Sequence, residues 1–86
     1  MINLDKVKIE LEKEGYQTLI RPLYEYGNCI DAKIPSDNEN ASLDAHFRIL
    51  IIENQFLLDF GSQVRKNKYF DTKDSLIDHI KEIFPL

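Results

Sequence analysis

The side chains best suited to chemistry in this chain are its single cysteine and two histidines. Cys29 would act as a nucleophile only if a nearby base helped its thiol to ionise. His46 and a carboxylate such as Asp44 are candidates for that role, but their spacing matches no catalytic arrangement and the chain has no nucleophile elbow. We therefore predict that the chain is not an enzyme and that Cys29 is a half-buried residue of a strand.

One segment carries side chains that could ligate a metal ion: Asp37, Glu39, Asp44 and His46. Counted from Asp37, an EF-hand loop would need glycine where Ser42 stands and glutamate where Arg48 stands. Zinc sites favour paired cysteines or histidines at short spacing, and the sequence has no such pair. The three glycines are isolated, so no phosphate-binding loop is present. We expect a solvated loop here, no metal and no cofactor.

The charges are more informative, because a net charge of −4 is spread unevenly along the chain. Asp74, Asp78 and Glu82 follow one another at intervals of four residues, just after Asp71. On a helix this spacing gives a row on the side opposite the apolar stripe. Such a row is either ordinary solvated surface or an acidic ridge that docks on a basic protein, where complementary charge selects the partner.

A basic segment offers a second hypothesis, in which the chain binds nucleic acid. Basic side chains neutralise phosphates and aromatic side chains stack on bases. The residues that would do so are Arg48, Arg65, Lys66, Lys68 and Tyr69. Three basic residues between 62 and 70 are few for a net-acidic chain, and no helix carries clustered arginine or lysine. A solvated turn or short strand is the simpler interpretation, and we expect nucleic-acid binding to be unlikely.

The elements that must position these groups centre on a hairpin at residues 46–60. Two apolar runs flank Asn54-Gln55, which we predict as the turn, with Glu53 opposite Phe56. Because alternate residues of a strand point to the same side, one face is a core face: Phe47, Ile49, Ile51, Phe56, Leu58 and Phe60. The reverse face carries three apolar residues, Leu50, Ile52 and Leu57, beside Arg48 and Asp59.

The remaining patterns predict a helix at each end of the chain. Asn3 can cap the first helix and Gly15 can end it, and Asp71 or Thr72 can cap the last, which stops before Pro85. Strands are expected at about 16–26, where Pro22 indicates an edge strand, and at 29–34 after a Gly27-Asn28 turn. The predicted fold is one α+β domain over residues 1–86, in the order α-β-β-β-β-α, with a short fifth strand left open. Its antiparallel sheet of four to five strands carries both helices on one face.

That arrangement would leave Leu50, Ile52 and Leu57 as an apolar patch on the open face of the sheet, where a protein partner or a second copy could bind. If the helices instead covered opposite faces, the patch would be ordinary core. Tyr24 and Tyr26 lie on one face beside a turn and could anchor a partner, since tyrosine is favoured at interfaces. Ile9 points away from the buried stripe of the first helix.

The chain has no stretch near the ~20 apolar residues of a membrane span, and its first residues do not form a signal peptide. With a single cysteine, it fits a reducing cytoplasm, and its composition hints at a bacterial, phage or plasmid source. A small acidic α+β chain without catalytic motifs resembles toxin-immunity proteins and phage-encoded inhibitors of host nucleases in size and charge. The leading hypothesis is an inhibitor of that type with a basic protein partner. Nucleic-acid binding and a structural homodimer are the alternatives.

Overall fold

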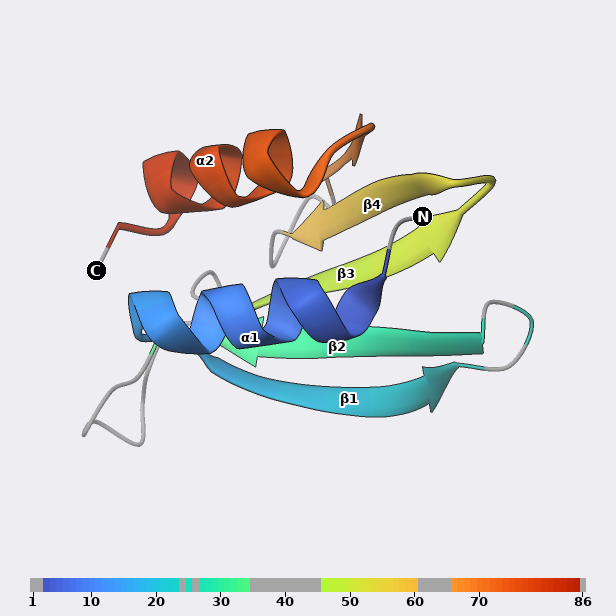
Figure 1. The fold of residues 1–86 in the computed structure, drawn as a ribbon, viewed down its shortest axis with the longest axis horizontal. Coiled ribbons are helices and arrows are strands. Elements are labelled where there is room, and N and C mark those ends of the chain that lie inside the picture. Colours follow the sequence, from blue (N-terminus) through green and yellow to red (C-terminus); the bar gives the residue numbers. More distant parts are fainter. Residues whose placement is uncertain (1–2, 24, 26, 35–45, 61–65, 86) are drawn as a thin grey trace.

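The computed structural model describes residues 3–23, 25, 27–34, 46–60 and 66–85. The elements follow the chain in the order α1 (Leu4–Glu14), β1 (Gln17–Leu23), β2 (Gly27–Lys33), β3 (His46–Ile52), β4 (Gln55–Phe60), β5 (Lys66–Phe70) and α2 (Lys73–Ile83). The strands form one antiparallel sheet in which each strand pairs with its neighbour in sequence (Figure 1). The predicted α+β class is confirmed, and the strand that the sequence left open is β5.

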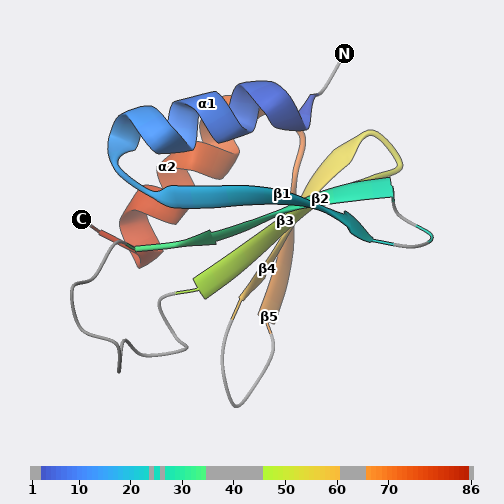
Figure 2. The ribbon, with the colours of Figure 1, turned by 90° about the horizontal axis from the view of Figure 1, so that it is seen from below.

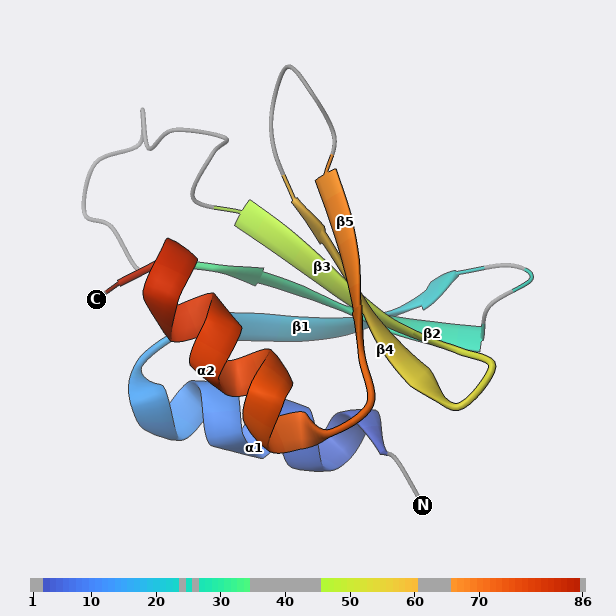
Figure 3. The same ribbon diagram turned by 90° about the horizontal axis from the view of Figure 1, so that it is seen from above.

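Both helices lie on the same face of the sheet, as predicted. Figures 2 and 3 show α1 and α2 together on one side of the strands, with α1 near β1 and β2 and α2 near β4 and β5. Lys81 of α2 forms an ion pair with Glu14 of α1, with 3.6 Å between Nζ and Oε1. The opposite face of the sheet carries neither helix, and we call it the helix-free face.

The ends of both helices follow the capping residues in the sequence. The Asn3 side chain accepts a hydrogen bond of 2.7 Å from the backbone N–H of Asp5, which satisfies one of the free donors at the start of α1. Gly15 ends α1 at a φ of 112°, which glycine adopts without steric cost. Thr72 caps α2 by accepting a hydrogen bond from the N–H of Ser75.

The main core fills the space between the helices and the sheet. Its buried residues come from both helices, their flanking residues and strands β2 to β5, while β1 contributes the half-buried Ile20: Val7, Leu11, Tyr16, Ile30, Ala32, Phe47, Ile49, Phe56, Leu58, Phe70, Leu76, Ile77, Ile80 and Phe84. At one end of this layer the rings of Phe47 and Phe84 stack with their centroids 4.8 Å apart. The Tyr16 hydroxyl donates a 2.5 Å hydrogen bond to the backbone oxygen of Phe84, which ties the end of α2 to the start of β1.

The register of the central hairpin corrects one prediction. The turn residues are Glu53 and Asn54, with φ of 51° and 64°, so Ile52 pairs with Gln55. A two-residue hairpin turn of this kind needs positive φ at both positions. The predicted turn placed Gln55 at the second position, whereas the structure places Asn54 there, and asparagine adopts positive φ more easily than glutamine. The two faces of the hairpin are nevertheless as predicted, because every pair moves by two residues and side-chain direction alternates with period two.

The first hairpin also differs from its predicted limits. β2 begins at Gly27, so Gly27 and Asn28 are strand residues that pair with Leu23 and Pro22 rather than the residues of a tight turn. Gly27 has a φ of 78°, which explains the glycine at this position. Pro22 lies in β1, which is an edge strand as predicted.

Candidate protein-interaction surfaces

The centre of the helix-free face is a second, smaller core. Cys29, Leu50 and Leu57 pack there against one another, and the half-buried Leu23 and Ile52 pack around them. Leu50 is only 6% exposed and Leu57 only 8%. The expectation of an exposed patch at Leu50, Ile52 and Leu57 is therefore wrong for the two leucines, although no helix covers them.

The register and twist of the sheet explain this burial. Cys29, Leu50 and Leu57 lie directly opposite one another on three adjacent strands, so their side chains cover each other across the sheet. The strands fan out strongly from β1 to β5 (Figures 2 and 3). Such a fan is the expected result of the right-handed twist of the strands. The large exposed apolar side chains among the described residues are Ile9 on α1 and, on the two edge strands of the helix-free face, Leu19 and Tyr69.

A row of charges borders this second core. Asp31 on β2 accepts hydrogen bonds from Arg48 Nε on β3 at 2.8 Å and from Arg21 Nη1 on β1 at 3.1 Å. Its carboxylate thus joins three strands. Asp59 lies opposite Arg48 on β4. The hydrogen bond that Arg48 donates to Asp31, the charge of Asp31 and the nearby Asp59 raise the pKa of the Arg48 guanidinium.

The buried thiol of Cys29 belongs to the second core and lies close to the charges of Asp31, Arg48 and Arg21. Burial and the charge of Asp31 raise its pKa, so the thiolate needed for nucleophilic chemistry is disfavoured. His46 is not beside it: Cys29 pairs with Leu50, and His46 precedes Leu50 by four residues, or about 13 Å along the strand. The structure does not bring the two candidate catalytic side chains together.

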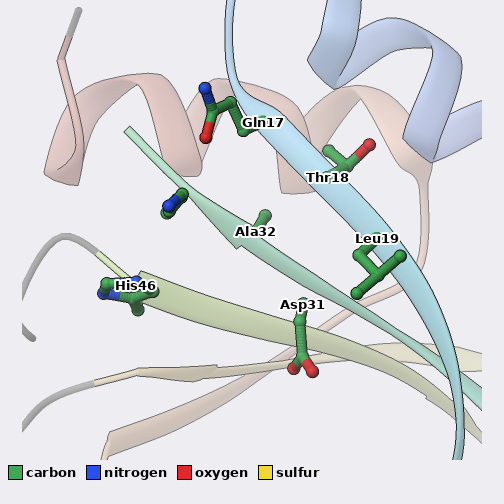
Figure 4. A pocket seen from close by; sticks show the side chains of 7 residues that line it. Gln17, Thr18, Leu19, Asp31, Ala32 and His46 are labelled. Carbon is green, nitrogen blue, oxygen red and sulfur yellow. The ribbon is translucent and has the colours of Figure 1, made fainter. Parts of the chain in front are cut away.

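The described residues line a hollow of about 260 Å³ at the end of β1, β2 and β3. Figure 4 shows Leu19 and Gln17 on β1, Asp31 on β2 and His46 on β3 around it. Leu19 is 59% exposed. The Asp31 carboxylate beside the hollow is held by two arginines, Arg21 and Arg48.

The acidic row of α2 lies on the other side of the molecule. Asp74, Asp78 and Glu82 are all exposed, and so is Asp71, which accepts a hydrogen bond from Gln55. None of the ion pairs found among the described residues involves the three carboxylates of the row. The row is the solvent face of α2, as predicted. It cannot share one flat interface with Leu50, Ile52 and Leu57, because the sheet separates them.

The residues expected to bind nucleic acid are dispersed. Arg48 is paired with Asp31 on the helix-free face. Lys66 and Lys68 lie opposite Phe60 and Leu58 on the helix side of β5, and Tyr69 lies opposite Leu57 on the helix-free side. Lysines and tyrosine therefore point to different faces of the same strand. The structure does not combine them into one basic and aromatic surface.

Several predicted site residues lie outside the described residues: Tyr24, Tyr26, Asp37, Glu39, Asp44 and Arg65. Within the described ranges, no group of three or more histidine, cysteine, aspartate or glutamate side chains could hold a metal ion. Within the same ranges, the helices are too short or too polar to cross a membrane.

The structure also shows a separation of charge that reading along the chain did not reveal. The two helices carry seven acidic and five basic residues, whereas the five strands carry two acidic and five basic residues. The helix layer is thus net negative and the sheet net positive. The sequence pattern also did not single out Arg21 and Asp31. Their ion pair depends on the register between β1 and β2, which the structure supplies.

Comparisons with protein-family models, curated protein sequences and solved structures found no significant match to this chain.

Proposed function

We propose that this chain is a cytoplasmic protein-binding domain of the inhibitor or immunity type, which acts by binding a basic protein such as a nuclease. Toxin immunity and phage anti-defence are the settings that suit a small acidic binder. The observation that carries the proposal is the position of Asp74, Asp78 and Glu82. They form an exposed row on α2 and join none of the ion pairs found among the described residues.

The charges around this row support a basic partner. Lys81 of α2 forms its ion pair with Glu14 of α1 and forms none with the row. The whole helix layer is net negative, so its field extends beyond the three side chains. Such a field speeds the encounter with a positive surface and disfavours acidic partners. The surfaces of nucleases that bind nucleic acid are basic for the same electrostatic reason.

The proposal favours α2 over the helix-free face as the main contact. Leu50 and Leu57 are already buried by their neighbours, so a partner could remove little further apolar area at these two side chains, and the exposed apolar area of that face is limited to its edge strands, at Leu19 and Tyr69. The sheet is also net positive. A homodimer through the helix-free face was suggested by an exposed apolar patch at Leu50, Ile52 and Leu57, and the burial of the two leucines weakens that suggestion.

A capture experiment tests this function with charge-reversed baits. The immobilised wild-type protein is compared, in extracts of the native host, with a triple variant Asp74→Lys, Asp78→Lys, Glu82→Lys. A control with the same net charge carries Asp5→Lys, Glu25→Lys and Glu53→Lys, at exposed positions outside α2. Circular dichroism verifies that each bait is folded.

We expect a basic protein to be captured by the wild type and the control but lost with the α2 variant. Equal capture by all three folded baits would show that the row is only solvated surface. Loss with both variants would show that net charge matters and that α2 does not.

A further inference from the structure

β5 is an edge strand with an accessible outer side. It is the last strand of the sheet, and among the described residues no strand lies beyond it. Lys66, Asn67, Lys68 and Tyr69 are all exposed. An edge strand pairs on one side only, so half of its backbone N–H and C=O groups point outward and can accept a further strand. The other edge, β1, contains Pro22, which has no N–H to donate.

The side chains of β5 select the charge of such a strand. Lys66 and Lys68 point to the helix side of the sheet, where their cross-strand neighbours Phe60 and Leu58 are apolar. Neither lysine joins an ion pair found among the described residues. The Lys68 ammonium lies 5.6 Å from the centroid of the Phe70 ring, which holds this charge beside the strand. On the other face, Tyr69 is 51% exposed.

A second copy of the chain is a poor occupant of this edge. Two β5 strands that pair antiparallel about Asn67 would place Lys66 opposite Lys68, and pairing about Lys68 would place that lysine opposite itself. Like charges directly opposite each other destabilise a strand pair. A strand whose residues alternate acidic and small or apolar side chains would instead place carboxylates opposite the lysines.

We propose that β5 binds an extended acidic segment of a protein partner by strand addition. The backbone of the segment would pair with the outer side of β5. Its carboxylates would lie beside Lys66 and Lys68, while the alternate side chains would pack on Tyr69. Main-chain hydrogen bonds would supply affinity and the alternating pattern would supply specificity, as in other complexes formed by strand addition. This site is separate from the acidic row of α2 and does not depend on its function.

The test uses the full chain and a labelled short peptide in which glutamate and threonine alternate. Fluorescence anisotropy measures its binding to the wild type and to the folded variant Lys66→Glu, Lys68→Glu. We expect the dissociation constant to rise at least about tenfold in the variant, since two opposite-charge pairs become like-charge pairs. A charge-matched control, Lys6→Glu with Lys13→Glu on α1, should leave binding unchanged.

Two further probes separate strand pairing from simple charge attraction. The same peptide with alternate backbone nitrogens methylated keeps its carboxylates but cannot form the main-chain ladder, and we expect it not to bind. An oligothymidylate of similar charge should bind more weakly than the peptide. Equal binding of the methylated peptide, stronger binding of the oligothymidylate, or no binding of the acidic peptide would each overturn the proposal. The last result would leave the lysines as residues that protect the edge from aggregation.

Discussion

The second core on the helix-free face leads to a quantitative prediction about Leu50. This side chain is 6% exposed and packs against Cys29 and Leu57, although no helix covers it. Truncation by Leu50→Ala removes buried apolar atoms and leaves a cavity, which typically costs about 2–5 kcal/mol. Because this cluster is small and lies at the surface of the sheet, we expect the lower end of that range, about 2–3 kcal/mol.

The same face offers a matched control. Leu19 is also a strand leucine, but it is 59% exposed at the edge of the sheet. We expect Leu19→Ala to change the free energy of unfolding by no more than about 0.5 kcal/mol. Urea denaturation, followed by circular dichroism, measures both variants. With a slope of about 1–2 kcal/mol per molar urea for a small domain, Leu50→Ala should lower the midpoint by about 1–3 M. If the two truncations lowered the free energy of unfolding equally, Leu50 would not be buried in a second core and would instead belong to an exposed apolar patch.

Three more predictions concern single polar groups. Asp31→Asn should cost about 1 kcal/mol at low salt, and less at high salt, because Arg48 loses its partner charge; a salt-independent cost in urea denaturation would contradict this. Burial raises the pKa of Tyr16 above its usual 10.0, so folding favours the neutral phenol. That stability is complete below the unfolded pKa and is lost as pH rises through the folded pKa. Tyr16→Phe removes the hydrogen bond to Phe84 and should therefore lower the free energy of unfolding by about 1 kcal/mol near neutral pH. The difference between the two proteins should become smaller above about pH 10. The buried Cys29 thiol should react with a disulfide reagent far more slowly in the native protein than in urea; equal rates would show an accessible thiolate.

The parts of the fold that were predictable from sequence depend on local chemistry. Asn3, Gly15 and Thr72 mark the helix ends because each has a specific role in satisfying free backbone groups. The two faces of the 46–60 hairpin follow from strict alternation. The turn was misplaced by one residue because both Asn54-Gln55 and Glu53-Asn54 are polar pairs, and only the backbone shows which residues adopt positive φ.

The features that were not predictable depend on contacts between strands. The burial of Leu50 and Leu57 requires Cys29 to lie beside them, and that depends on the register between β2 and β3. The Asp31 ion pairs likewise join three strands whose alignment the sequence does not state. The candidate sites show the same difference between features set by local sequence and features set by contacts between strands. The acidic row on α2 could be read from its four-residue spacing, whereas the separation of the nucleic-acid residues onto different faces could not.

The most direct test of the proposed function is to map where the partner binds on this protein. Once the captured basic protein is known, an NMR titration of the isotope-labelled chain with that protein maps the contact residue by residue. We predict that the largest chemical-shift changes fall on α2, at Asp74, Asp78, Glu82 and their exposed neighbours, and that added salt weakens binding. Changes confined to the strands of the helix-free face, with α2 unaffected, would contradict the proposal.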